Sequence, residues 1–181
     1  MNLPNRLTLI RVCMIPIFVF FMLTDYVPYS KWFAVIIFII ASLTDLLDGK
    51  IARRYNLVTN FGKFMDPLAD KLLVCSALIC FVDLKLISAW IIIVIISREF
   101  IISGFRLIAS DNGVVIAAGY WGKLKTVSQM IMSILLIIHI EHPVYQIVEQ
   151  IFIYLSLLLT VISLVDYLYK NKQVLSTKNQ K

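Results

Sequence analysis

The sequence predicts an all-α integral membrane protein with six transmembrane helices. Of its 181 residues, 60% are hydrophobic and only 15% are charged, and the mean hydropathy is +0.88. A soluble domain has about 45–50% apolar and about 25% charged residues, so its surface would not carry this apolar excess. The apolar residues also form six runs of roughly 17–26 residues, and about 20 residues cross a bilayer as a helix. A chain of this length needs only one domain, which we expect to span residues 1–181 with a polar tail at 170–181.

The six apolar runs are separated by short polar segments, and each run predicts one span. The first contains Pro16, which we expect to kink the helix. The second and third become polar where they adjoin, and the fourth is interrupted by Ser97-Arg98-Glu99. The predicted spans are Leu7–Leu23, Lys31–Arg53, Phe61–Phe81, Leu86–Ile108, Tyr120–Ile140 and Val144–Tyr169. The first run has no small-residue cleavage site after it, so we expect no cleavable signal peptide.

Lysine and arginine residues are distributed unequally between the two ends of these spans. Loops on the cytoplasmic side of a membrane protein carry the excess of positive residues. One side has only Lys31 and Lys85 in its turns. The other side carries Arg6, Arg11, Lys50, Arg53, Arg54, Lys63, Arg106, Lys123, Lys125, Lys170, Lys172, Lys178 and Lys181. We therefore expect both termini on the cytoplasmic side of the cell membrane, in agreement with an even number of spans.

Four aspartates follow a regular spacing where the second and third spans adjoin. The sequence reads TDLLDGKIAR at 44–53 and GKFMDPLAD at 62–70, a D-x-x-D-G-x-x-A-R pattern followed by G-x-x-x-D-x-x-x-D. Asp45 and Asp48 are one helical turn apart, as are Asp66 and Asp70, so each pair shares a helix face. The connection is short, which predicts antiparallel neighbouring helices. We expect the four carboxylates to converge near the cytoplasmic interface.

Carboxylates at this depth require compensating positive charge. A lone aspartate at the bilayer centre costs about 2.5–3.5 kcal/mol, and clustered anions also repel one another. Ligation by oxygen alone suits Mg²⁺ or Mn²⁺. Four carboxylates suit two such ions about 3.5–4 Å apart, an arrangement that clamps the attacking and leaving oxygens around a phosphorus. A solvated helix end is the simpler interpretation of one D-x-x-D, but it does not account for two acidic faces on adjacent apolar helices.

Small residues and an arginine accompany the first acidic pair. Gly49 leaves bare backbone beside Asp48, and Ala52 is small on the following turn, so a large ligand has room to approach this helix. Arg53 is suited to hold a phosphate through two hydrogen bonds.

The complete pattern resembles the signature of the CDP-alcohol phosphatidyltransferase family and matches it at all eight fixed positions. Six membrane helices with cytoplasmic termini are also similar to that family. The resemblance implies an enzyme of phospholipid biosynthesis that moves a phosphatidyl group from CDP-diacylglycerol to an alcohol. It also implies a homodimer in membrane lipid, and we expect no nucleic-acid partner.

The resemblance further implies roles for the residues of the pattern. Divalent metal ions would be ligated by Asp45, Asp48, Asp66 and Asp70. Asp70 would also be the catalytic base that takes the proton of the acceptor. The cytidine diphosphate would be cradled by Gly49, Ala52 and Arg53.

The N-terminal segment LPNRLTLIR at 3–11 supplies further polar groups. It is similar to the opening of bacterial family members that use glycerol 3-phosphate, in which these groups help to bind the nucleotide. Asn5 and Thr8 are therefore candidate nucleotide contacts, with helix capping as the alternative. Thr59, in the loop after the motif, is another candidate.

Basic residues in the fourth and fifth spans are candidates for binding a phosphate on the acceptor. Charged residues within a membrane span are functional candidates by default. The candidates are Arg98, Arg106, Lys123 and Lys125. The alternative for Arg98 is a structural ion pair that involves Glu99, and the alternative for the two lysines is a role as cytoplasmic anchors.

These cations favour a phosphorylated acceptor, and the N-terminal resemblance favours glycerol 3-phosphate. Inositol phosphate and phosphatidylglycerol remain alternative acceptors, as do serine and choline-type alcohols. Outside the family, an aspartate-rich prenyltransferase should show two separated acidic motifs and more spans. A cation transporter would leave Gly49, Ala52 and Arg53 without a purpose, and we see no inverted repeat.

Overall fold

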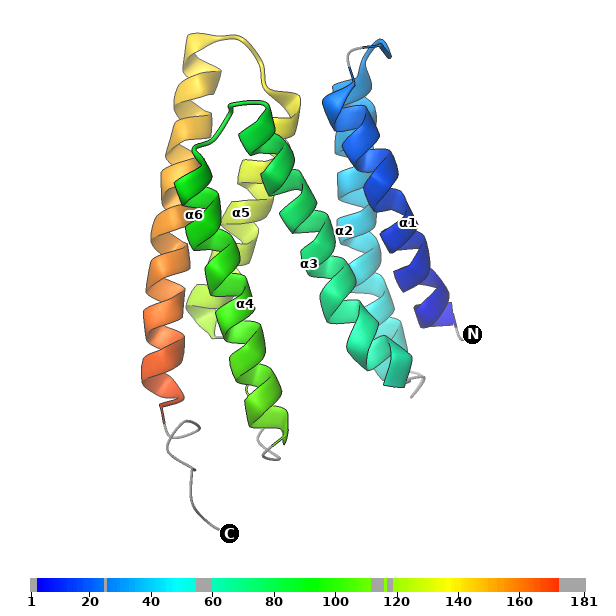
Figure 1. The fold of residues 1–181 in the computed structure, drawn as a ribbon, viewed down its shortest axis with the longest axis vertical. Helices are drawn as coiled ribbons and strands as arrows, with labels where there is room; N and C mark the ends of the chain where they lie inside the picture. The colour runs from blue at the N-terminus through cyan, green and yellow to red at the C-terminus, as the bar shows by residue number, and fades with distance from the viewer. Residues whose placement is uncertain (1–2, 25, 55–59, 112–115, 117–118, 173–181) are drawn as a thin grey trace. The chain divides into compact units, whose positions relative to one another are not determined.

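The computed structural model contains six α-helices within the part of the chain that it describes (Figure 1). The structure describes residues 3–24, 26–54, 60–111, 116 and 119–172, and for 3–5, 45–54, 60–67, 70, 110 and 111 it describes the helical backbone only. The helices are α1 (Leu3–Leu23), α2 (Ser30–Arg54), α3 (Asn60–Asp83), α4 (Ala89–Asp111), α5 (Tyr120–Ile138) and α6 (Pro143–Lys170). The predicted all-helical fold with six helices is confirmed.

The helix ends differ from the predicted span ends by up to four residues, as where α1 begins at Leu3 rather than Leu7, and the start of α4 has a clear structural reason. The fourth span was expected from Leu86, whereas α4 begins at Ala89. Lys85 adopts a positive φ of 59°, and the N–H of Leu86 donates to the carbonyl of Phe81 over 2.9 Å. This turn ends α3 and keeps the apolar residues after Lys85 out of the next helix. Hydropathy alone does not detect such a turn.

Within the part of the chain that the structure describes, three helices are long and apolar enough to cross a membrane. These segments are Arg6–Leu23, Tyr120–Ile138 and Pro143–Lys170, while α2 contributes the shorter apolar stretch Ser30–Thr44. The helix α4 is about as apolar on average as these helices, but it carries three charged residues, Arg98, Glu99 and Arg106, close together. That all six helices cross the bilayer stays a prediction.

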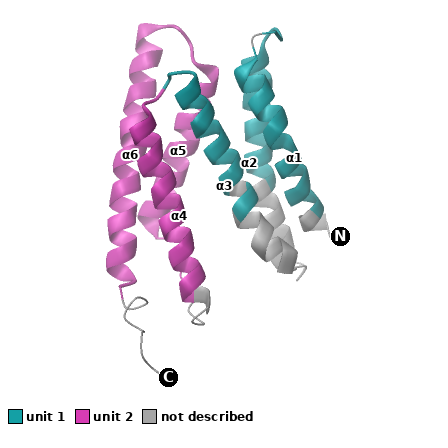
Figure 2. Cartoon of the chain, in the orientation of Figure 1, with its two compact units in different colours: residues 1–86 teal, residues 87–181 magenta. Residues whose placement is uncertain are grey.

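The chain divides into two compact units, Met1–Leu86 and Ile87–Lys181 (Figure 2). In the first unit, α1 contacts α2 and α3, and α2 contacts α3. Phe18 of α1 meets Phe38 of α2 with ring centroids 5.8 Å apart, beside the fully buried Ala34 and Ala41. Small residues such as these alanines let membrane helices approach closely. The N-terminal end of α1, the C-terminal end of α2 and the N-terminal end of α3 lie at the same end of this unit (Figure 1).

In the second unit, α6 packs against both α4 and α5. Ile102 and Phe105 of α4 form an apolar cluster with Tyr167 of α6. The α5–α6 contact buries Met132 and Leu136, and it also contains polar side chains that hydrogen-bond within it. The C-terminal ends of α4 and α6 lie at the same end of this unit as the N-terminal end of α5 (Figure 1).

Two histidines shape the connection between α5 and α6. His139 ends α5 with a φ of 38°, and its Nδ1 lies 3.0 Å from Oε1 of Glu149. Nδ1 of His142 accepts a hydrogen bond from the N–H of Val144 at the start of α6. These contacts stabilise the turn between α5 and α6.

Candidate active site

The four aspartates of the motif lie on two helices that contact each other. Asp45 and Asp48 lie in the C-terminal part of α2, and Asp66 and Asp70 lie in the N-terminal part of α3. The helical setting and the neighbouring helices are as expected. The side chains of these aspartates lie outside the described residues, so the convergence of their carboxylates stays a prediction.

Helical periodicity places the acidic positions on the faces by which these helices pack. On α2 the buried residues Ala34, Phe38 and Ala41 follow a three-or-four-residue spacing, and positions 45 and 48 continue it. On α3 the buried Leu73 and Ala77 are preceded at the same spacing by positions 66 and 70. Each buried face therefore becomes acidic at the same end of the unit.

The helix α1 shows the same change from apolar to polar at that end. Its buried face runs from Met22 through Phe18 and Ile15 to Arg11 and Thr8. Arg11 is only 1% exposed and Thr8 is fully buried. A buried guanidinium is costly unless it is compensated, and Arg11 lies at the same end of the unit as the acidic positions. The burial of Arg11 was not predicted, because the sequence indicates only a cytoplasmic cation there; its three-residue spacing from Thr8 is the signal of a shared helix face.

The structure gives positions for some of the residues that are predicted to contact the nucleotide. Helix α1 begins at Leu3, so Asn5 and Thr8 lie inside the helix, which argues against the capping alternative. Gly49, Ala52 and Arg53 lie in the last turns of α2, where only the helical backbone is described. Thr59 lies outside the described residues.

The structure brings two of the four basic candidates together on one carboxylate. Arg98 Nη1 lies 2.9 Å from Oε1 of Glu99, and Lys125 Nζ forms an ion pair with the same oxygen. Arg98 Nε also donates to Ser163 Oγ over 3.1 Å. Arg98 and Lys125 are only 8% and 2% exposed. The ion pair that the sequence left open as an alternative is therefore present.

The other two basic candidates stand apart from this ion-paired group. Arg106 is exposed, and its guanidinium carbon lies 5.7 Å from the centroid of the Tyr167 ring, within the range of a cation–π contact. Lys123 is also exposed. The predicted basic pocket thus consists of two buried cations held by Glu99 and two exposed cations on the same three-helix unit.

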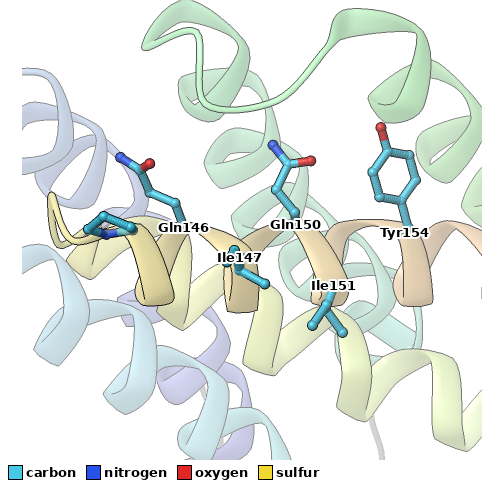
Figure 3. Close-up of a pocket in the computed structure, with 6 residues that line it drawn as sticks. Gln146, Ile147, Gln150, Ile151 and Tyr154 are labelled. Atoms are coloured by element: carbon cyan, nitrogen blue, oxygen red, sulfur yellow. The ribbon is translucent and has the colours of Figure 1, made fainter.

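An open groove of about 660 Å³ lies along the N-terminal half of α6 and holds none of the predicted site residues. Figure 3 shows Gln146, Gln150 and Tyr154 projecting to one side of α6, with Ile147 and Ile151 on the neighbouring face. None of the described residues that line this groove is charged, so it does not match the polar chemistry of the predicted site.

The four aspartates of the motif are the residues whose chemistry suits a metal ion. Among the side chains that the structure describes, no group of three or more His, Cys, Asp or Glu residues is placed to hold a metal ion. The motif aspartates are not among those side chains. Four aspartates at these helix positions offer the oxygen ligands that hard divalent cations prefer.

Together these features define a helical membrane protein that gathers acidic positions and a buried arginine at one end of a three-helix unit. Residues 1–162 match the sequence model of the CDP-alcohol phosphatidyltransferases, and the chain belongs to this family. Enzymes of this family generally depend on a divalent metal ion. Family membership decides against the prenyltransferase and the transporter.

Relatives of this chain carry a more specific name, CDP-diacylglycerol–glycerol-3-phosphate 3-phosphatidyltransferase. The chain is 44% identical to the Bacillus subtilis protein of that name, over 98% of this chain and 99% of the relative. It is 38% identical to the Haemophilus influenzae protein, over 92% and 91% of the two chains. It is 36% identical to the Rickettsia bellii protein, over 92% and 93%.

Proposed function

We propose that this chain transfers the phosphatidyl group from CDP-diacylglycerol to sn-glycerol 3-phosphate, which gives phosphatidylglycerophosphate and CMP. One observation carries this proposal: the relatives named for this reaction match the chain over nearly its whole length, at 44% identity for the Bacillus subtilis protein. The spacing of the four aspartates and the placement of their helices support the same reaction class.

In the proposed reaction, the 1-hydroxyl oxygen of glycerol 3-phosphate bonds to the phosphorus that carries the diacylglycerol. The bond between that phosphorus and the phosphate oxygen of CMP breaks, and CMP leaves. Asp70 takes the hydroxyl proton as general base, a role that contributes about 10²–10⁴-fold to rate in enzymes. Proton removal is needed because a neutral hydroxyl is a weak nucleophile.

We propose that two divalent ions, Mg²⁺ or Mn²⁺, are held by Asp45, Asp48, Asp66 and Asp70. Bound there, they would neutralise the charge of the pyrophosphate and of the departing CMP. Gly49 and Ala52 leave room for the cytidine diphosphate beside α2, and Arg53 holds its phosphates. Asn5, Thr8 and Thr59 are the proposed contacts to the nucleotide.

The phosphate of the acceptor is proposed to bind the basic residues of the second unit. These are Arg98, Arg106, Lys123 and Lys125. Their charges and donor groups suit a phosphate dianion, and nothing comparable is needed for serine or a choline-type alcohol. No observation favours inositol phosphate or phosphatidylglycerol as acceptor over glycerol 3-phosphate.

The proposed setting of the reaction is the cytoplasmic face of the cell membrane. Six spans with both termini in the cytoplasm would put the acidic end of α2 and α3 at that face, where glycerol 3-phosphate is available. The whole chain would act as one catalytic domain, as a homodimer. The diacylglycerol tails would stay in the bilayer during transfer.

The test is CMP release by the purified protein in detergent with CDP-diacylglycerol and single acceptors. We expect release with glycerol 3-phosphate when Mg²⁺ or Mn²⁺ is present and none after chelation. Parallel reactions contain inositol phosphate, phosphatidylglycerol, serine or choline. Release with one of these and not with glycerol 3-phosphate would replace the acceptor, and release with none of the alcohols would refute the proposed reaction.

A further inference from the structure

Glu99 lies where three helices of the second unit meet through polar side chains. From α4 it pairs with its neighbour Arg98 and with Lys125 of α5, through the same carboxylate oxygen. Its side chain is 21% exposed, whereas those of its two partners are 9% and 3% exposed. Two buried cations would repel each other strongly in an apolar surrounding, and one shared carboxylate offsets that cost. The three residues together still carry a net charge of +1.

The Arg98 guanidinium is held on two sides. Nη1 donates to Glu99 over 2.9 Å, and Nε donates to Oγ of Ser163 on α6 over 3.1 Å. The Ser163 hydroxyl donates in turn to the carbonyl of Thr160 over 3.0 Å. Because a guanidinium is planar and rigid, two bonded nitrogens determine the position of the third.

The third nitrogen, Nη2, has no hydrogen-bond partner within the described part of the chain. It points towards Gly122 in the first turns of α5, where a Cβ on the glycine would lie 3.5 Å from it. Apart from the two chain neighbours of Gly122 and the nearby backbone of α5, no other heavy atom lies within 4 Å of that Cβ position. The absent side chain of Gly122 therefore leaves open space directly beside a fixed cationic donor.

We propose that Glu99 and Ser163 are positioning residues that aim Arg98 Nη2 past Gly122 at the phosphate of the acceptor. This inference rests on the proposed function and assigns roles within its acceptor site. Glu99 and Ser163 each hold the donor in place through one hydrogen bond. Gly122 is the specificity-determining residue, because any side chain there would occupy the space that a phosphate oxygen needs.

Gly122→Ala tests this geometry directly. The added Cβ would make an ordinary 3.5 Å contact with Nη2, so the helix is expected to fold normally. It would also cover the donor. We expect the KM for glycerol 3-phosphate to rise about tenfold, as for loss of a hydrogen bond to a charged group, with little change in the KM for CDP-diacylglycerol. Inorganic phosphate should also weaken as a competitive inhibitor.

Gly104→Ala on α4 is the matched control. A Cβ there meets nothing within 4 Å, so the same helix substitution is made without covering a donor, and both KM values should stay unchanged. An unchanged KM for glycerol 3-phosphate in Gly122→Ala would overturn the inference. So would an equal rise in the KM for both substrates, because that would indicate general damage to the enzyme.

Glu99→Gln tests the positioning role, with Glu149→Gln as its control. Glu149 is a buried carboxylate of the same unit that pairs with His139, so its substitution removes a similar charge elsewhere. We expect only Glu99→Gln to raise the KM for glycerol 3-phosphate about tenfold, while kcat at saturating acceptor falls less. Equal effects of the two variants would overturn the positioning role. Should Glu99→Gln not fold, Gly122→Ala still decides the inference.

Different results would refute the proposed function and the proposed role of Gly122. If the wild-type protein released no CMP with any alcohol, the proposed function itself would be wrong. If the wild type used glycerol 3-phosphate and Gly122→Ala kept its KM, the function would stand and only this inference would fall.

Discussion

Both units of this protein contain buried ionisable residues. Arg11 in the first unit and Arg98 and Lys125 in the second are each less than one-tenth exposed, in a chain of which 60% of the residues are hydrophobic. Isolated charges in such surroundings are costly, and proteins retain them where they pair or bind ligands. For Arg98 and Lys125 the pairing is visible, because both contact Glu99.

Asp70→Asn is predicted to abolish turnover. The amide keeps the size of the side chain but cannot accept the proton of the acceptor hydroxyl, so we expect CMP release to fall at least about 100-fold. Folding should be preserved, as judged by thermal unfolding in detergent. Asp83→Asn, at the exposed far end of α3, is the control and should keep its activity. Near-normal turnover of the Asp70 variant would remove this residue from the role of base.

Arg106→Ala is predicted to raise the KM for glycerol 3-phosphate, by about tenfold if one charge-assisted contact is lost. Lys172→Ala is its control, because Lys172 also lies over an aromatic ring, that of Tyr169, at 5.4 Å. The control removes a comparable cation–π contact from a residue with no proposed role in the site. A rise only in the KM for CDP-diacylglycerol would mean that Arg106 belongs to the donor site.

At the scale of elements, the α5–α6 contact combines apolar packing with short polar side chains. Met132 and Leu136 of α5 are almost fully buried, and Ser128 Oγ lies 2.9 Å from Ser156 Oγ of α6. Apolar burial gives little drive to helix association within lipid, so packing and interhelical hydrogen bonds hold such helices together. The same helix α6 carries Ser163, which accepts a hydrogen bond from Arg98 Nε of α4.

Met132→Ala is predicted to destabilise this contact, while Ile131→Ala is not. Met132 is fully buried, so truncation leaves a cavity that costs about 2–5 kcal/mol in the free energy of unfolding. Ile131, its neighbour in the chain, is 39% exposed and leaves no enclosed cavity. Unfolding of both variants in detergent measures the difference. Equal stabilities would show that α5 does not pack through this face.

At the scale of the whole molecule, function depends on the orientation of the helices in the membrane. The acidic end of α2 and α3 must lie on the side that supplies glycerol 3-phosphate. The excess of lysine and arginine predicts that this side is the cytoplasm. The short connection between α5 and α6, which contains Glu141, would then face outwards.

This orientation is testable with single introduced cysteines. In intact cells, a membrane-impermeant maleimide should label Glu141→Cys, because this exposed position lies in the predicted outer connection. Lys172→Cys, exposed after the end of α6, should be labelled only after the cells are permeabilised. The unmodified protein measures the background from Cys13, Cys75 and Cys80. The reverse labelling pattern would invert the topology.

The sequence by itself determined the number of helices, their approximate ends and the reaction class. Membrane helices follow from the transfer free energies of successive residues, and the family follows from the spacing of Asp45, Asp48, Asp66 and Asp70, so both are local properties of the chain. The tertiary structure decided which polar groups meet. Arg98 and Ser163 are 65 residues apart, and Glu99 and Lys125 are 26 apart, yet they form one group. Such contacts depend on which helix faces pack together, and periodicity within one helix does not specify its partner.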